Sequence, residues 1–225
     1  MVDRKQVIPG DVIARGNYRY GNYIEKRGDE YVALRIGLAE VSHEDVKLNP
    51  LAGPYMPRAD DQVIGKVIDI NGFGWVVDIN SCFDGFLPAS FVFGREFSPA
   101  THDLSSRFRV GDVIGARIES FDRSRDPQLS IRGEGYGKIS EGEIIRVSPT
   151  KVPRLIGKRG SMINLISERT HCDVQVGQNG VIVVVGPPEG IVKTVNVIKM
   201  IDSEARGADL KGKVEEYLGG SSAGS

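Results

Sequence analysis

Two glycines flank two cations in residues 155–163 of this chain. The segment reads Leu-Ile-Gly-Lys-Arg-Gly-Ser-Met-Ile, with Lys158 and Arg159 between Gly157 and Gly160. Because glycine has no Cβ, the backbone at these two positions can approach another chain closely. The amides of a following helix N-terminus favour an anion, and the two cations add attraction that does not depend on sequence. This combination predicts a clamp for an anionic backbone such as that of a nucleic acid.

The sequence around the loop predicts the elements that hold it in place. Ser161 is the expected N-cap of the helix that follows the loop. In chain order we expect a strand at 143–147, the loop at 155–163 and a helix at 161–169. Two strands at 173–176 and 181–185 and a second helix at 191–201 should follow. This order resembles a type I KH domain over residues 137–205, in which the glycine loop clamps single-stranded nucleic acid. The resemblance implies RNA contacts at Arg154, Ile156, Gly157, Lys158, Arg159, Gly160 and Ser161.

Local charge supports this interpretation, whereas the overall charge does not. The chain has 29 basic and 30 acidic residues, so its net charge alone would not indicate a nucleic-acid partner. No acidic residue interrupts residues 146–159, whose basic members are Arg146, Lys151, Arg154, Lys158 and Arg159. A solvated surface face is the alternative explanation for this cluster.

Residues 59–136 predict a small antiparallel barrel. Short β-rich runs alternate there with Gly, Asp and Asn turns. The series resembles the S1-type OB-fold of ribosomal protein S1, and OB barrels hold single strands by stacking bases on aromatic rings in a basic groove. S1 domains typically place two aromatics around the first glycine and a histidine further on. Here Phe73 fills the first place, but Val76 stands at the second and Pro88 replaces the histidine.

We therefore expect a stacking surface reduced to Phe73, with Trp75 as a substitute. Barrel packing is an equally weighted explanation for both rings. The predicted RNA contacts of this domain are Phe73, Trp75, Lys66, Arg107, Arg109, Arg117, Arg123, Arg125 and Arg132. Because residues 59–136 hold 8 basic against 12 acidic residues, any basic track must be local.

Residues 1–58 predict a further β domain. Tyr18, Tyr20 and Tyr23 are spaced for one or two strands, and prolines at 50, 54 and 57 mark a linker. The tyrosines fit either internal packing or an interface with a partner. Residues 206–225 predict a short helix and a flexible end. The expected fold class is thus multidomain, mainly β plus α+β.

The order of a β domain, an S1 domain and one KH domain resembles the RNA-binding cap subunits of the archaeal exosome. The resemblance implies a non-catalytic subunit, three copies of which sit on a hexameric ring of RNase PH-like subunits. Such a subunit recruits single-stranded RNA and guides it to this 3′-to-5′ exoribonuclease for degradation or polyadenylation. We expect a cytoplasmic chain, since it has only two cysteines and no stretch of about 20 apolar residues that could cross a membrane.

Two alternatives remain open at this point. The chain fits, less well, a free-standing S1-KH transcription or translation factor. A metal-dependent nuclease is the weaker alternative, with carboxylates at Asp60, Asp61, Asp122 and Asp126. The cluster His171-Cys172-Asp173 suits a structural role better, because adjacent side chains point in different directions. We expect no catalytic residue, no metal and no cofactor.

Overall fold

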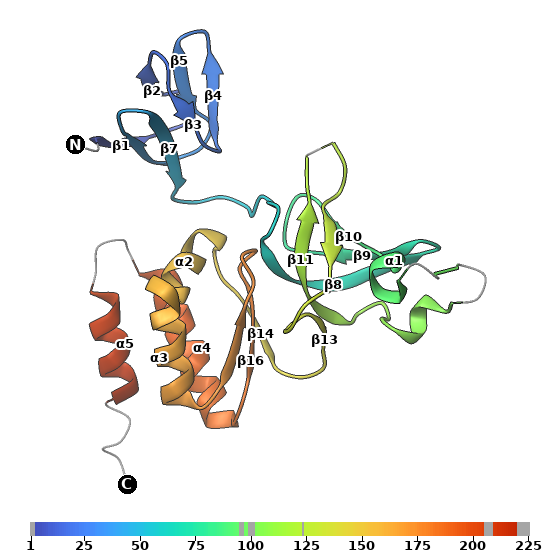
Figure 1. Cartoon of the computed structure of the whole chain (residues 1–225). Helices are drawn as coiled ribbons and strands as arrows, with labels where there is room; N and C mark the ends of the chain where they lie inside the picture. Colours follow the sequence, from blue (N-terminus) through green and yellow to red (C-terminus); the bar gives the residue numbers. More distant parts are fainter. Residues whose placement is uncertain (1–2, 95–96, 99–101, 123, 205–208, 220–225) are drawn as a thin grey trace. The chain divides into compact units, whose positions relative to one another are not determined.

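The computed structural model describes residues 3–94, 97–98, 102–122, 124–204 and 209–219. Its backbone contacts divide the chain into two compact units, Met1–Gly53 and Pro54–Ser225 (Figure 1). The first unit is built of strands, and the second holds a barrel followed by a mixed helix and strand domain. The predicted fold class, mainly β plus α+β, is confirmed.

The N-terminal unit packs two small sheets around one core. Its strands are β1 (Asp3–Val7), β2 (Val12–Arg15), β3 (Arg19–Tyr20), β4 (Ile24–Arg27), β5 (Glu30–Ala33), β6 (Gly37–Val41) and β7 (Asp45–Pro50). One sheet has the order β1-β6-β7-β3 and the other β2-β5-β4. The core between them is formed by Val7, Ile24, Tyr31, Ala33, Ala39, Val46 and Leu48.

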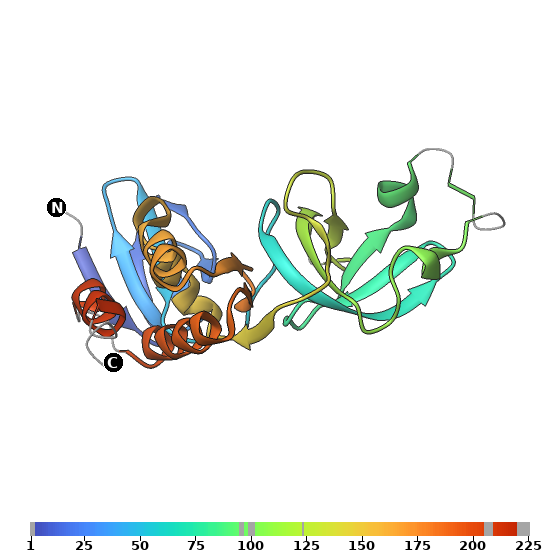
Figure 2. The same ribbon diagram turned by 90° about the horizontal axis from the view of Figure 1, so that it is seen from below.

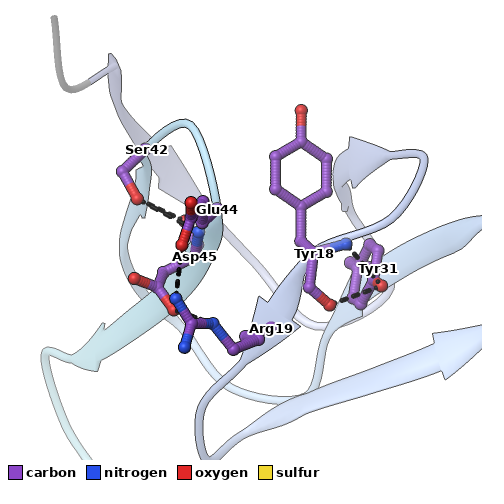
Figure 3. Close-up of polar contacts among 6 residues, drawn as sticks. All are labelled: Tyr18, Arg19, Tyr31, Ser42, Glu44 and Asp45. Atoms are coloured by element: carbon purple, nitrogen blue, oxygen red, sulfur yellow. Dashed lines mark hydrogen bonds and ion pairs between the residues drawn. The ribbon is translucent and has the colours of Figure 1, made fainter.

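Tyr31 anchors the segment that contains Tyr18 and Tyr20 to the core of this unit. Its side chain is 0% exposed, and its hydroxyl donates to the carbonyl oxygen of Tyr18 at 2.8 Å and accepts from the Tyr18 amide at 3.0 Å (Figure 3). The Tyr20 ring also packs on Tyr31, with 5.5 Å between ring centroids. Tyr18 therefore serves internal packing, whereas Tyr20 stays 51% exposed.

Ion pairs at the neighbouring turn hold β3 against β7. The Arg19 guanidinium contacts Glu44, and its Nε lies 3.5 Å from an Asp45 carboxylate oxygen (Figure 3). Within the turn, the Ser42 hydroxyl donates to the Asp45 carbonyl oxygen at 3.1 Å and accepts from the Asp45 amide at 3.1 Å. These exposed ion pairs contribute little stability each, so the Tyr31 core is the main anchor of the unit.

Strands β8 to β12 close into a barrel. The elements are β8 (Gln62–Asn71), β9 (Gly74–Asp78), β10 (Gly85–Pro88), α1 (Ala89–Phe93), η1 (Leu104–Ser106), β11 (Val113–Ser120), β12 (Gln128–Ser130) and β13 (Gly137–Ile139). The sheet order is β12-β10-β9-β8-β11-β13, and pairing of β12 with β11 closes it. At Gly65 in β8 a Cβ would lie 2.5 Å from Cγ1 of Val77, so only glycine fits where β8 passes the end of its antiparallel neighbour β9.

The last domain places its helices on one face of a short sheet. Its elements are β14 (Glu143–Arg146), η2 (Pro149–Lys151), α2 (Val152–Ile156), η3 (Lys158–Gly160), α3 (Ser161–Thr170), β15 (Asp173–Val176), β16 (Val181–Val185), α4 (Pro188–Ser203) and α5 (Leu210–Gly219). The sheet order is β14-β16-β15, with all pairs antiparallel. Helices α2, α3 and α4 cover one face of it (Figure 1). The C-terminal helix α5, red in Figure 2, lies beside α3 and α4.

Strand β16 is buried on both faces, because the barrel covers the face that the helices leave open. Ile182 and Val184 belong to the core under the helices. Val181 and Val183 instead pack with Ile64 of the barrel, together with the partly buried Val113, Ile139 and Val185. The all-valine and isoleucine run of β16 is therefore explained by burial on two sides.

Asn179 joins the two domains through a buried hydrogen-bond network. It is 0% exposed, and its Nδ2 donates to the carbonyl oxygens of Ile64 at 2.7 Å and Ile79 at 2.9 Å. Asn80 Nδ2 donates a hydrogen bond to the Asn179 carbonyl oxygen at 2.8 Å. Beside it, the Gln178 amide donates to the carbonyl of Gln62 at 2.7 Å. The Gly-Gln-Asn-Gly segment of residues 177–180 thus inserts into the barrel and joins the two domains.

A further ion pair braces the start of β11 against β13. The Asp112 carboxylate accepts from the Arg109 amide at 2.9 Å and from Lys138 Nζ at 2.8 Å. The Arg109 amide, and then the Lys138 ammonium, hold the pKa of Asp112 below its ordinary value. A carboxyl whose pKa is lowered by folding stabilises the fold above its unfolded pKa, and this contribution is lost as pH falls through the folded pKa.

We expect Asp112→Asn to lower the free energy of unfolding at pH 7 and to lose less stability than the wild type between about pH 5 and pH 3. Urea unfolding at both pH values measures this difference. The exposed Asp84→Asn is the matched control and should follow the wild type. An equal pH dependence in Asp112→Asn and the wild type would remove Asp112 from the stability of the barrel.

Candidate nucleic-acid interface

The loop between α2 and α3 adopts a backbone conformation that depends on its two glycines. Gly157 has φ 74° and ψ −179°, and Gly160 has φ 80° and ψ 5°. Both positive φ values are readily adopted only by glycine. A Cβ on Gly157 would also lie 2.8 Å from the amide nitrogen of Met162. Glycine is therefore required where this loop passes the start of α3.

Lys158 and Arg159 lie at the tip of the loop with their charges available. Both side chains are exposed, and neither forms an ion pair with any residue in the described part of the chain. The first amides of α3, which have no partner inside the helix, follow directly after them. Exposed cations beside a helix N-terminus are suited to binding an anion, as the sequence predicts.

Ser161 does not cap α3. It is the first helical residue, with φ −60°, and the N-cap is Gly160, which has no side chain to accept a hydrogen bond. The predicted cap at Ser161 is wrong because the left-handed glycine already ends the loop one residue earlier. Ile156 is half-buried and packs against the core under the helices, so its side chain supports the loop from below.

The other basic residues of this segment are held by the protein itself. Lys151 Nζ and Arg154 Nη1 both donate to the carbonyl oxygen of Glu204, at 2.6 Å and 2.8 Å. Arg146 lies 3.9 Å from the carboxylate of Asp78 on the barrel. Because cations stabilise the C-terminus of a helix, Lys151 and Arg154 fasten the end of α4 to the start of α2. Arg154, a predicted RNA contact, is thus directed to Glu204.

The barrel carries a groove beside the loop between β11 and β12. Its volume is about 450 Å³, and we call it the aromatic groove; its lining residues are Phe86, Ser120, Phe121, Asp122, Arg125, Asp126 and Gln128. The Phe121 ring is supported from behind by Phe83, with the two rings edge to face and 5.0 Å between centroids. Two aromatic rings with one arginine form the kind of surface on which bases stack.

Phe73 and Phe86 lie on neighbouring parts of the barrel surface. Phe73 is 72% exposed in the turn between β8 and β9. Phe86 is paired with Val76 across β9 and β10, and its ring tip would lie 3.0 Å from a Cβ on Gly74. Phe86 therefore supplies an aromatic ring next to the position where Val76 replaces one. The sequence reasoning missed it, although the alternation within Gly85–Pro88 could have indicated an outward ring.

Trp75 belongs to the barrel core. It is 0% exposed, its Nε1 donates to the carbonyl oxygen of Phe108 at 3.0 Å, and the two rings meet edge to face at 5.3 Å. The prediction that Trp75 substitutes for a missing stacking residue is wrong, because strand alternation turns its side chain inward.

The predicted barrel cations do not gather at one place. Arg125 lines the aromatic groove. Arg117 is partly neutralised, because its guanidinium lies 3.4 Å from an Asp60 oxygen and 3.1 Å from a Glu119 oxygen. The Arg132 guanidinium sits 4.8 Å from the ring centre of Phe91.

Three further cations, Lys66, Arg107 and Arg109, are exposed but do not line the groove. The Arg107 guanidinium lies 5.8 Å from the ring centre of Phe108. Arg123 lies outside the described residues. Only Arg125 is therefore placed with the aromatic rings of the groove.

The carboxylates considered for metal binding are engaged in local structure. Asp61 accepts a hydrogen bond from the Tyr55 hydroxyl at 2.6 Å, and burial raises the pKa of Asp61. Asp122 accepts from the Ser124 hydroxyl at 2.7 Å, which lowers the pKa of Asp122. Within the described ranges, no three His, Cys, Asp or Glu side chains are grouped so that they could hold a metal ion.

Comparisons with known proteins agree with this geometry. A model of the S1 RNA binding domain matches residues 56–132, and a model of the KH domain matches residues 142–200. The chain is 45% identical over 216 residues to the exosome complex component Rrp4 of Nitrosopumilus maritimus, covering 96% of both chains. It is 39% identical over 220 residues to the Rrp4 component of Sulfurisphaera tokodaii, covering 96% of this chain and 89% of the relative.

A solved structure has a similar fold over three quarters of the chain. The crystal structure of a candidate exosome complex RNA-binding protein matches with a TM-score of 0.69 and 38% identity, covering 75% of this chain and 97% of that one. None of the described helices is long and apolar enough to cross a membrane. The fold and the site thus define a protein of the S1-KH class. At this identity and coverage, the chain belongs to the Rrp4 family of exosome components.

Proposed function

We propose that this chain is the non-catalytic RNA-binding cap subunit of an archaeal exosome. The proposal rests on the loop at Lys158 and Arg159, two exposed cations that form no ion pair within the described residues. The domain that carries this loop is joined to the barrel at Asn179. RNA would be held at the loop and at the aromatic groove. The division of the chain at residues 58, 136 and 205 stays a prediction.

The expected partner is a ring of catalytic subunits. Three copies of the chain would cap a hexameric ring of RNase PH-like subunits in the cytoplasm, and the ring would supply the catalysis of degradation or polyadenylation. Avidity among three copies could make modest individual sites effective without any new contact. The Rrp4 relatives support an exosome partner, since each is named as a component of an exosome complex.

Light scattering tests the assembly. The purified chain is mixed with ring subunits encoded by the same genome, and the mass of the complex is measured. We expect one ring with three copies of this chain. A chain that stays monomeric at micromolar concentrations beside an intact ring would favour the free-standing factor.

The remaining alternative is a nuclease, and it is tested with the isolated chain. Labelled RNA incubated with the chain and Mg²⁺ should be bound but not shortened. RNA cleavage that disappears in Asp60→Asn or Asp122→Asn would instead establish a metal-dependent nuclease.

Phe73 gives a further expected result. Because its ring is exposed, Phe73→Ala should leave the melting temperature unchanged but remove one stacking platform, worth about 1–3 kcal/mol per base. We expect the Kd for single-stranded RNA to rise about fivefold or more. Fluorescence anisotropy measures this, with the exposed Val110→Ala as the control. Equal affinity in Phe73→Ala and the wild type would exclude Phe73 from the RNA surface.

A further inference from the structure

A second pocket lies where the barrel meets the KH sheet, apart from both the glycine loop and the aromatic groove. Its volume is about 320 Å³, within the usual range of ligand sites. The barrel contributes the start of β8, Gly115 of β11 and residues 134–136, and the KH domain contributes β15. Its polar and aromatic side chains are Gln62, Glu134, Tyr136, Asp173 and Gln175. We call this the junction pocket.

The KH side of the junction pocket is the free edge of a sheet. Strand β15 ends the order β14-β16-β15, so only one of its edges is paired within the sheet. The Gly177 amide donates to the carbonyl of Val181 at 2.8 Å, and paired residues alternate along an antiparallel strand. The backbone groups of Val174 and Val176 therefore point away from β16. They offer donors and acceptors at fixed positions along the pocket wall.

The junction pocket is also unsuited to phosphate. Glu134 and Asp173 contribute two carboxylates, and no described lining residue is basic. A phosphate group would be repelled there, so a bound strand must keep its backbone outside. Carboxylates accept hydrogen bonds from exocyclic amino groups of bases, and the amides of Gln62 and Gln175 can both donate and accept. The Tyr136 ring adds a face on which a base can stack.

We propose that the junction pocket holds one unstacked nucleobase of bound RNA and selects bases with an exocyclic amino group over uracil. This inference rests on the proposed RNA-binding function and adds a site for base selection between the loop and the barrel. Adenine, cytosine and guanine each present an amino group to the carboxylates, whereas uracil presents none. RNA recognition of this kind typically targets single strands whose bases are splayed out.

The test compares two RNA oligomers of equal length, oligoadenylate and oligouridylate, by fluorescence anisotropy on the full chain. The double variant Glu134→Gln/Asp173→Asn should bind both at least as tightly as the wild type, because two repulsive charges are removed. Its preference for oligoadenylate should fall about fivefold or more, since a good base contact discriminates by about 1–3 kcal/mol. The control Glu189→Gln/Glu216→Gln makes the same charge change at exposed residues of α4 and α5 and should keep the preference.

Tyr136 provides the second measurement. Tyr136→Ala should lower the affinity for both oligomers, whereas Tyr136→Phe should keep the wild-type affinity, because the ring and not the hydroxyl provides the stacking face. If the folded double variant kept the wild-type ratio of the two affinities while RNA binding still depended on Lys158 and Arg159, base selection by the junction pocket would be rejected. The proposed RNA-binding function would stand. A wild-type chain that binds neither oligomer would instead overturn the proposed function.

Discussion

Replacing Lys158 and Arg159 together with aspartate should weaken binding of single-stranded RNA by roughly 10- to 100-fold. Both cations are exposed and lie beside the first amides of α3, so reversal of their charge turns an attractive site into a repulsive one. The dependence of affinity on salt should also flatten, because each phosphate contact to a single strand contributes about −0.7 to the slope of log K against log salt. The loss should be similar for RNAs of different sequence.

This expectation is checked by anisotropy titrations at several salt concentrations. Gly157 and Gly160 are untouched in the variant, so the melting temperature should stay close to that of the wild type. The control is Lys193→Asp/Lys199→Asp, which makes the same charge change on α4. If the folded loop variant kept its affinity and its salt slope, or if the control lost as much, the loop would not be the clamp.

The second large effect is expected at Asn179. Asn179→Ala removes the donor to two buried carbonyl oxygens, those of Ile64 and Ile79. Each unsatisfied buried group costs about 1–3 kcal/mol, so the loss of the donor to two groups should lower the free energy of unfolding by about 2–6 kcal/mol. Asn179→Asp should be at least as harmful, because it turns a carboxylate toward the same two carbonyl oxygens.

Urea unfolding measures this loss, with Gln178→Ala as a neighbouring control whose bond to Gln62 uses only the backbone amide. RNA length gives an independent measurement. A short RNA that reaches only the loop should bind the Asn179 variant almost normally, whereas a longer RNA should lose the gain from contacting the barrel as well. Wild-type stability in Asn179→Ala would show that the network does not hold the domains together.

The glycine loop could be predicted from the sequence because its conformation depends on local residue types. Features that depend on tertiary contacts could not be predicted in this way. Gly157 and Gly160 are the residue type that most readily adopts the positive φ values of this loop, although Arg159 between them is left-handed as well. The cap at Ser161 was misplaced by one residue because the glycine before it ends the loop in a left-handed conformation. Nothing local in residues 177–180 indicates that Asn179 enters a barrel about a hundred residues earlier in the chain, since its partners exist only after folding.

Which aromatic side chains are exposed also could not be predicted from residue type alone. Trp75 and Phe73 are two residues apart, yet one lies in the core and the other in solvent, because Phe73 sits in a turn where strand alternation no longer applies. Phe86 could not be predicted as a stacking residue because it lies on β10, whereas the missing aromatic belongs at Val76 on β9. Only the pairing of β9 with β10 brings the two positions together.

The central claim is that this chain captures RNA for a catalytic ring that it does not itself supply. The most direct measurement is the rate at which the exosome ring degrades a labelled single-stranded RNA, with no cap, with the wild-type chain and with the Lys158→Asp/Arg159→Asp variant bound to it. We expect a faster rate with the wild-type cap, and a rate near that of the bare ring with the variant, although both assemble equally. A wild-type cap that leaves the rate unchanged, or a variant that accelerates degradation as well as the wild type does, would contradict it.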